Sequence, residues 1–156
     1  MSAAFAHDSN THDPRKRVID LLARCSRDEL EAAMVTLEQI PSYLRLRGPE
    51  TGLVIVKGRI GGGGSPFNLG ETTVSRAAIH LEDGRVGHGF RLGTDRRAAE
   101  LSAVFDALWQ AETERSFVEQ TLLLPAERKQ ALETDALARE TAATKVDFFT
   151  MVRGED

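Results

Sequence analysis

The first third of the chain has apolar residues at helical spacing. Asp13 followed by Pro14 is a typical helix start, with an acceptor side chain at the cap and proline in the first turn. Ser26–Glu29 has the pattern of a capping box and predicts a second helix, which ends before Pro41. The two predicted helices have apolar stripes that pack inward: Val18, Leu21, Leu22 and Cys25, then Leu30, Ala33, Met34 and Leu37.

From Tyr43 to Leu92 the apolar period changes to two, which indicates β-strands. Three strands are predicted, over Leu53–Ile60, Thr72–Leu81 and Arg85–Leu92. Asp83-Gly84 between the last two strands is a strong hairpin signal. Twelve of the thirteen glycines lie between Gly48 and Gly93, so backbone freedom is concentrated in the predicted sheet.

Helical spacing returns after Asp95, with a long helix through Leu108, a further turn over residues 112–118 and a last helix over residues 126–144. The order of elements predicts an α+β fold: an N-terminal helix pair, a mainly antiparallel sheet with the Asp83-Gly84 hairpin, C-terminal helices and a terminal strand-like segment. We expect a single domain over residues 13–156, preceded by a flexible tail at residues 1–12.

A two-residue turn at Asp83-Gly84 would place five candidate residues together on one face of the hairpin. In that register Arg76 lies opposite Arg91, and His80 lies opposite Gly87, beside Gly89. Two arginines that face each other are unfavourable unless an anion lies between them or they point apart. The cluster predicts an anion site, a contact for acidic side chains of a partner, or simply solvent-facing charge.

The C-terminal segment 145–156 carries apolar residues on both faces of its strand-like pattern. A terminal segment of this kind needs cover on both faces, and the preceding helix has only Leu132 and Leu137 as bulky apolar residues. We therefore predict that segment 145–156 docks against another subunit, through Val146, Phe148, Phe149, Met151 and Val152.

Charge is distributed unevenly along the chain. The net charge is −4, yet residues 45–97 hold nine basic and five acidic side chains, and arginine outnumbers lysine 16 to 4. Overall acidity disfavours nucleic-acid binding, whereas arginine suits forked contacts with phosphates or carboxylates. The sequence shows neither a run of apolar residues long enough to span a membrane nor a secretory signal pattern, so we expect a soluble, cytoplasmic protein.

The chain shows no complete catalytic or metal-binding motif, and we predict neither catalytic nor metal-ligating residues. The Gly61–Gly64 run lacks the lysine and hydroxyl residue of a phosphate loop. Cys25 lies on an apolar stripe and indicates packing, and His88 is interpreted as a core histidine. In the hairpin register above, His80 and His88 lie on opposite faces and do not share a metal.

Several segments closely resemble the PhnG family, subunits of the bacterial carbon–phosphorus lyase core complex. The resemblance covers about residues 15–156 and is most specific at Leu69–Ala77, the Asp83-Gly84 turn, Asp95–Leu108 and Asp147–Glu155. Ser75 stands where the family often has threonine, a change that keeps a hydroxyl group.

The resemblance implies a role in phosphonate catabolism. A PhnG subunit acts with PhnH, PhnI and PhnL to convert ATP and an alkylphosphonate into α-D-ribose 1-alkylphosphonate 5-triphosphate and adenine. It implies a core with two copies each of PhnG, PhnH, PhnI and PhnJ, in which PhnG lies against PhnI. No cofactor is expected on this chain, with ATP as a substrate of the complex, and no catalytic residue of the family maps onto it.

These features favour a structural and assembly subunit that is not catalytic alone. Two alternatives remain open at the level of sequence. One is a free-standing enzyme of ribosyl or phosphoryl transfer, and the other is a DNA-binding regulator with an N-terminal helix-turn-helix.

Overall fold

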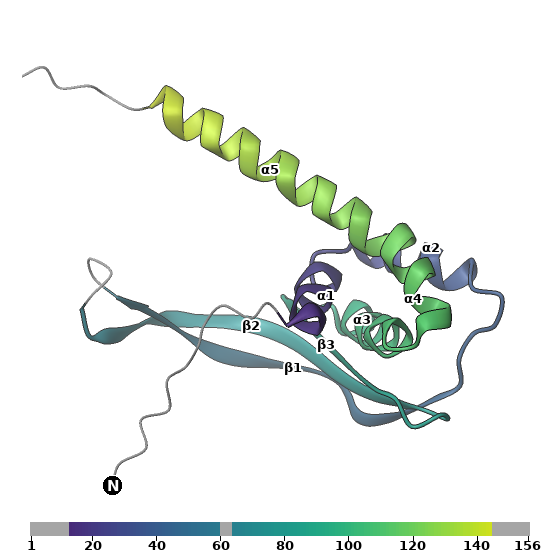
Figure 1. The fold of residues 1–156 in the computed structure, drawn as a ribbon. Helices are drawn as coiled ribbons and strands as arrows, with labels where there is room; N and C mark the ends of the chain where they lie inside the picture. Colours follow the sequence, from purple (N-terminus) through teal and green to yellow (C-terminus); the bar gives the residue numbers. More distant parts are fainter. Residues whose placement is uncertain (1–12, 60–63, 145–156) are drawn as a thin grey trace, which may run out of the picture.

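The computed structural model describes residues 13–59 and 64–144. The predicted tail at residues 1–12 and the predicted strand-like segment at residues 145–156 lie outside the described residues. In chain order the elements are α1 (Pro14–Leu22), α2 (Arg27–Val35), β1 (Tyr43–Arg59), β2 (Pro66–Leu81), β3 (Val86–Leu92), α3 (Arg96–Trp109), α4 (Glu112–Val118), the π-helical turn η2 (Glu119–Leu123) and α5 (Leu124–Ala143) (Figure 1).

Both predicted helix starts are confirmed by their caps. The Asp13 carboxylate accepts a hydrogen bond from the Arg15 backbone N–H at 3.0 Å. The Ser26 hydroxyl accepts from the Glu29 N–H at 3.2 Å, and the Glu29 carboxylate accepts from the Ser26 N–H at 2.6 Å. These bonds satisfy N–H groups that lack partners in the first turn of a helix. They fix where α1 and α2 begin.

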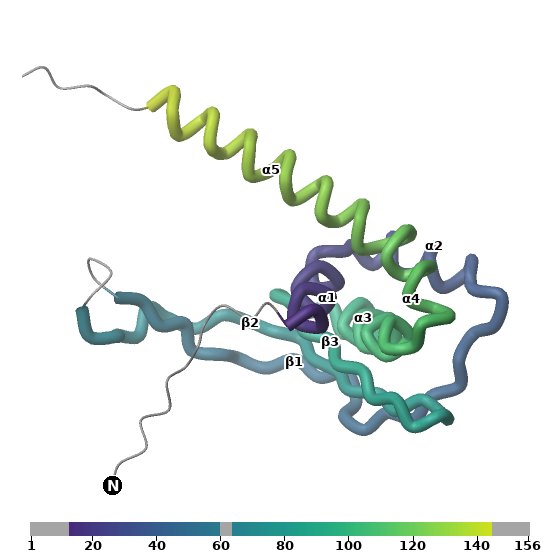
Figure 2. Tube along the Cα trace, in the orientation of Figure 1, coloured from purple at the N-terminus to yellow at the C-terminus, as the bar shows by residue number. Residues whose placement is uncertain are grey.

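The sheet has three antiparallel strands in the order β1-β2-β3, which confirms the α+β class. β1 and β2 begin earlier than predicted and are long, so they run on together past the end of β3 (Figure 2). The last β2–β3 pair is Val74 with Leu92, and β1 and β2 continue pairing as far as Arg59 and Pro66. We call this two-stranded extension, residues 53–59 and 66–73, the arm.

The turn between β2 and β3 contains three residues rather than the predicted two, and this shifts the register by one. The Leu81 N–H donates to the Arg85 carbonyl at 2.8 Å, the Gly84 N–H donates to the Leu81 carbonyl at 3.0 Å, and Gly84 has a φ of 95°. A tight turn followed by a left-handed glycine is the usual three-residue hairpin. The predicted pairing is therefore wrong: His80 lies opposite Val86, and Arg76 lies opposite Phe90.

One face of the sheet packs on α3, and two glycines make this contact close. A Cβ atom added at Gly87 would lie 1.8 Å from the Ala103 carbonyl oxygen, and one added at Gly89 would lie 1.9 Å from that of Ala99. No side chain fits at either position, so the glycine side of β3 is the buried side. Together with Ala77, Ile79 and Leu81 of β2 it forms the core face of the sheet.

α3 is the centre of the core, because every residue from Ala98 to Leu108 is buried. The sheet lies on one side of it, and α1, α2 and α4 lie on the others (Figure 1). α5 begins at this core through buried Leu122 and Leu123 of η2, then projects away without a single buried residue. The predicted last helix is confirmed, and the absence of buried residues in it agrees with its few bulky apolar side chains.

Candidate docking surface

The face of the sheet opposite α3 is not covered by any described helix. Successive side chains of a strand alternate between faces and directly paired residues share a face, so the residues between the buried positions, with their partners, define this open face. Its apolar members reach 71% exposure at Leu44, 47% at Phe90 and 74% at Leu92. The open face consists of Leu44, Arg47, Glu50, Val54 and Val56 of β1, Val74, Arg76, Ala78 and His80 of β2, and Val86, His88, Phe90 and Leu92 of β3.

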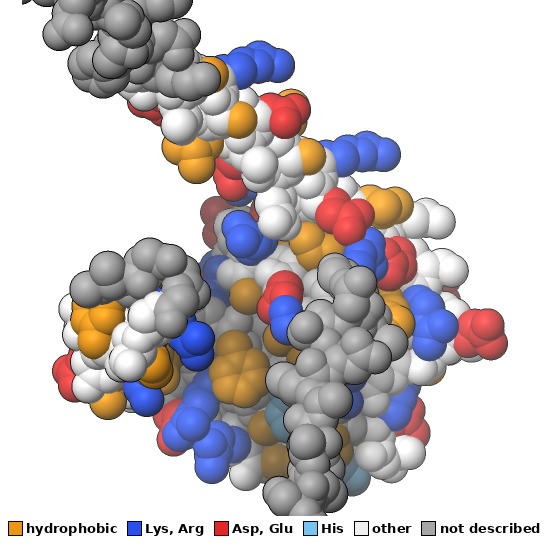
Figure 3. Space-filling model, turned by 60° about the vertical axis from the view of Figure 1, so that its left-hand side comes forward, with side chains coloured by type: hydrophobic (Ala, Val, Ile, Leu, Met, Phe, Trp, Pro, Cys, Tyr) orange, Lys and Arg blue, Asp and Glu red, His pale blue; other side chains and the backbone are white. Residues whose placement is uncertain are grey.

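The arm is apolar on both faces. Leu53 and Ile55 are 65% and 57% exposed on one face, and Val54 and Val56 are 44% and 40% exposed on the other. Leu69 adds a 62% exposed side chain from β2. Figure 3 looks toward the arm and shows its apolar and basic side chains side by side. A two-stranded hairpin is marginally stable in water, so this exposed surface needs cover from outside the described fold.

The open face has one compact ion-pair cluster. The Arg76 guanidinium lies 2.6 Å from the Glu50 carboxylate, and Arg47 lies 3.6 Å from the same carboxylate. All three side chains are about half exposed, so each pair contributes at most about 1 kcal/mol to folding. Two arginines share one acid here, which leaves a local excess of positive charge beside the apolar residues.

The five residues of the predicted anion site do not come together. Arg76 and His80 lie on the open face, whereas Gly87 and Gly89 lie under α3. Arg91 lies opposite Ser75 on the core side and donates to the Cys25 carbonyl at 2.7 Å. The one-residue shift in register separates them, since it moves each β3 side chain to the other face. A role in binding for Arg76 and His80 individually stays a prediction.

The same shift corrects two interpretations of histidines. His88 lies on the open face and not in the core, and His80 and His88 share that face instead of lying on opposite ones. Within residues 13–59 and 64–144 there is no group of three or more His, Cys, Asp or Glu residues placed to hold a metal ion.

Three buried or half-buried acids anchor the helices and were missed by sequence reasoning. Asp106, with no exposed surface, accepts from the Arg15 guanidinium at 2.8 Å and from the His88 N–H at 2.8 Å. Glu119 accepts from Arg17 at 3.1 Å and from the Trp109 indole at 2.8 Å. Asp106 follows Phe105 in the apolar stretch of the predicted long helix, and a charged residue in such a stretch indicates a buried acid with a partner.

The third acid, Glu100, is 2% exposed and holds β1 against α3. It accepts from Arg45 at 2.6 Å and from the Tyr43 hydroxyl at 3.0 Å. Burial alone would raise the pKa of Glu100, but these hydrogen bonds outweigh it and hold the pKa below its ordinary value. The acid is therefore ionised and fully engaged within the fold, which is a structural rather than a catalytic arrangement.

Cys25 is buried and packs in the core, as predicted. Burial raises the pKa of its thiol to about 11, and its sulfur lies 3.5 Å from the Leu21 carbonyl oxygen. A nucleophilic cysteine requires a lowered pKa and access to solvent. Cys25 has neither.

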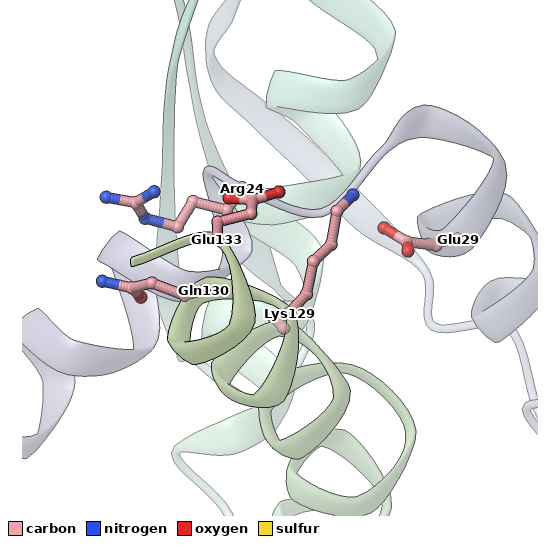
Figure 4. Close-up of a pocket in the computed structure, with 6 residues that line it drawn as sticks. Arg24, Glu29, Lys129, Gln130 and Glu133 are labelled. Carbon is pink, nitrogen blue, oxygen red and sulfur yellow. The ribbon is translucent and has the colours of Figure 1, made fainter. Parts of the chain in front are cut away.

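The surface pockets of the described residues differ in their linings, and none of the four has a lining of basic residues alone. One lies between α5 and the first two helices and is lined by Arg24, Glu29, Ala126, Lys129, Gln130 and Glu133. Lys129 and Glu29 are directed toward the same space (Figure 4). Acid and base alternate around this pocket, so it offers no single-sign site for a phosphate. The exposed sheet surface remains the strongest candidate for function.

Comparison with known protein families adds to this geometry. Residues 13–154 match the family described as "Phosphonate metabolism protein PhnG". The chain belongs to the PhnG family. A relative from Rhizobium meliloti (strain 1021) is 52% identical over 156 residues, covering 100% of this chain and 99% of its own length. That relative is named "Alpha-D-ribose 1-methylphosphonate 5-triphosphate synthase subunit PhnG".

The family match confirms the resemblance found in the sequence. The matched range of this PhnG member includes the whole arm and the open face. No helix of the described part is both long and apolar enough to cross a membrane.

Proposed function

We propose that this chain is a structural and assembly subunit of a complex that synthesises α-D-ribose 1-methylphosphonate 5-triphosphate in phosphonate catabolism. The relative's name, a synthase subunit, and membership of the PhnG family support this assignment. Within the proposal the complex uses ATP and an alkylphosphonate as substrates and acts in the cytoplasm, where ATP is supplied. The synthase is a transferase as a whole, and the chemistry belongs to other subunits.

The arm carries this proposal. A hairpin with exposed leucine, isoleucine and valine on both faces is stable when partners cover it, and monomeric proteins seldom expose patches of this kind. The buried acids Asp106 and Glu100 are engaged in structural contacts, and the buried Cys25 thiol is protonated. These observations support docking rather than catalysis. PhnI is the proposed main partner, with PhnH, PhnJ and PhnL in the same complex and two copies of this chain in its core.

The proposal predicts that apolar residues of the arm are needed for assembly and not for folding. Changing Phe67 and Leu69 together to serine is expected to weaken co-purification with the co-expressed subunits by at least about tenfold, because two exposed apolar contacts are lost. The melting temperature of the isolated chain is expected to stay within a few degrees. Quantitative pull-down and circular dichroism measure the two effects.

The matched control is Val35→Ser, which removes an apolar side chain that is 82% exposed at the end of α2, away from the sheet. This variant is expected to assemble as the wild type does. Unchanged assembly of the arm variant would contradict the docking role. Turnover of ATP and methylphosphonate by the purified chain alone would contradict the assignment of the chemistry to other subunits.

A further inference from the structure

The two edge strands of the sheet, β1 and β3, differ in how far their outward backbone groups are occupied by hydrogen bonds. At the β3 edge the His88 N–H donates to Asp106 at 2.8 Å. The Val86 carbonyl accepts from Arg15 and from the Gln110 amide, each at 2.8 Å. Side chains thus occupy the backbone groups that would otherwise pair with another strand. This is a common way to protect an edge from association.

The first half of the β1 edge is also unsuited to pairing. The register of β1 against β2 shifts between Arg45 and Arg47 and again between Arg47 and Glu50. Pro49 lies within this irregular stretch and has no backbone N–H to donate. Bulges and proline interrupt the row of free backbone groups from Tyr43 to Glu50.

The second half of the β1 edge, Thr51–Arg59, contains no proline. Its one register shift, between Val56 and Lys57, places the extra residue, Leu69, on β2, so β1 itself has no inserted residue there. Pairing with β2 is regular from Glu50 to Val56, and among the described residues no hydrogen bond from outside the sheet reaches the backbone of Thr51–Arg59. The direction of its free groups follows from the neighbouring strands. The Gly93 N–H donates to the Thr73 carbonyl, so Thr73 directs its backbone groups toward β3 and away from β1.

Backbone groups alternate in direction along an antiparallel strand. Thr72 and Val74 therefore face β1, where they pair with Val54 and Gly52. By the same alternation Leu53 and Ile55 direct their N–H and C=O groups to the free edge. The free edge is a row of unpaired donors and acceptors, bordered above and below by apolar side chains.

We infer that a β-strand from another subunit of the proposed complex adds to the Thr51–Arg59 edge of β1. This inference rests on the proposed function and specifies how the arm docks. Main-chain hydrogen bonds supply the affinity in strand addition, and alternate side chains supply the specificity. Because Leu53 and Val54 are exposed on opposite faces, the added strand is apolar on both of its faces and brings covering layers with it.

A second copy of this chain satisfies these requirements less well. Two arms paired edge to edge would form a wider sheet that is still apolar and uncovered on both faces. A different subunit covers the faces as well as the edge. Lys57 and Arg59 near the end of the arm outnumber Glu71, its described acid, so the partner strand is expected to carry acidic residues there.

The test compares two substitutions at one position in the co-expressed complex. Ile55→Ala removes most of the side chain and keeps the outward N–H, whereas Ile55→Pro also removes that N–H. Proline is tolerated on an edge strand whose N–H faces solvent, so the β1–β2 pairing is expected to survive. Strand addition predicts an affinity at least about tenfold lower for Ile55→Pro than for Ile55→Ala, because a partner carbonyl loses its donor.

Residue-resolved amide hydrogen exchange of the wild-type chain gives a second readout that no substitution perturbs. In the isolated chain the amides of Leu53 and Ile55 are expected to exchange at least about tenfold faster than those of Val54 and Val56, which pair with β2. In the complex all four are expected to be protected.

The outcomes separate the inference from the proposed function. Equal assembly of Ile55→Pro and Ile55→Ala, or Leu53 and Ile55 amides that stay unprotected in a complex that forms, would overturn strand addition and leave the assembly role intact. Protection of these amides in the purified chain alone, with a dimer in light scattering, would overturn it in favour of pairing between two copies. Absence of any complex with the wild-type chain would instead overturn the proposed function.

Discussion

Replacing Gly89 with alanine is expected to lower the free energy of unfolding by about 3 kcal/mol or more. The added methyl group would lie 1.9 Å from the Ala99 carbonyl oxygen and 2.8 Å from the Ala103 nitrogen. Both are backbone atoms of a helix that is buried along its length, so the clash is relieved only by moving α3 away from the sheet. The melting temperature is expected to fall by roughly 6–12 °C, measured by circular dichroism.

Gly70→Ala is the matched control, because a Cβ atom at this position in β2 meets nothing within 4 Å. Its free energy of unfolding is expected to change by less than about 1 kcal/mol, since the new side chain is accommodated and the unfolded chain is stiffened. Equal stability of the Gly89 and Gly70 variants would show that α3 does not approach β3 as closely as the structure places it.

Replacing Asp106 with alanine is expected to lower the free energy of unfolding by about 3 kcal/mol. The substitution removes the acceptor of the Arg15 guanidinium and of the His88 N–H at the same time. Arg15 turns to water because its side chain is 36% exposed, but the contact that joins α1 to α3 and β3 is lost. Urea denaturation measures the effect.

Two comparisons make this prediction specific. Asp20→Ala breaks an ion pair with Lys16 whose side chains are 60% and 75% exposed, and is expected to change stability by less than about 0.5 kcal/mol. Arg15→Ala combined with Asp106→Ala is expected to cost less than the sum of the single changes, by about 1–3 kcal/mol. An Asp106 variant as stable as the Asp20 variant would mean that this contact does not hold α1 in place.

The local signals of the sequence predicted the elements well. Asp13-Pro14 and the Ser26–Glu29 box placed both N-terminal helices, because capping is a matter of a few neighbouring residues. The apolar period of two identified the sheet, in which Ala77, Ile79 and Leu81 of β2 are buried. These features depend on contacts within one turn or one strand, which a single sequence displays directly.

The register of the hairpin was wrong because Asp83-Gly84 is compatible with loops of two and of three residues. Packing against α3 selects the three-residue loop, because only glycines at positions 87 and 89 on the inner face allow the helix to approach. This contact joins segments that are distant in sequence. The shift moved His88 from the expected core to the open face. The predicted grouping of Arg76, His80, Gly87, Gly89 and Arg91 on one face depended on this pairing and does not form.

The docking surface was only partly visible in the sequence. Leu53 to Val56 alternate as any strand would, and their pattern does not show that both faces of the arm are exposed. That conclusion depends on which elements cover the arm, and α3 packs on the part of the sheet that includes β3, not on the arm (Figure 1). The predicted docking role of Val146, Phe148, Phe149, Met151 and Val152 falls on residues outside the described ranges and stays a prediction.

The central claim is that this chain docks through its arm. Size-exclusion chromatography with light scattering of the co-expressed subunits tests it most directly when the wild-type chain is compared with one that lacks only the arm. Val54 pairs with Thr72, so residues 55–71 can be replaced by Asn-Gly to close a short hairpin while the body is kept. The wild-type chain is expected to elute within the complex, and the shortened chain to elute alone with an unchanged melting temperature. Elution of the shortened chain within a complete, active complex would contradict the claim that this chain docks through its arm.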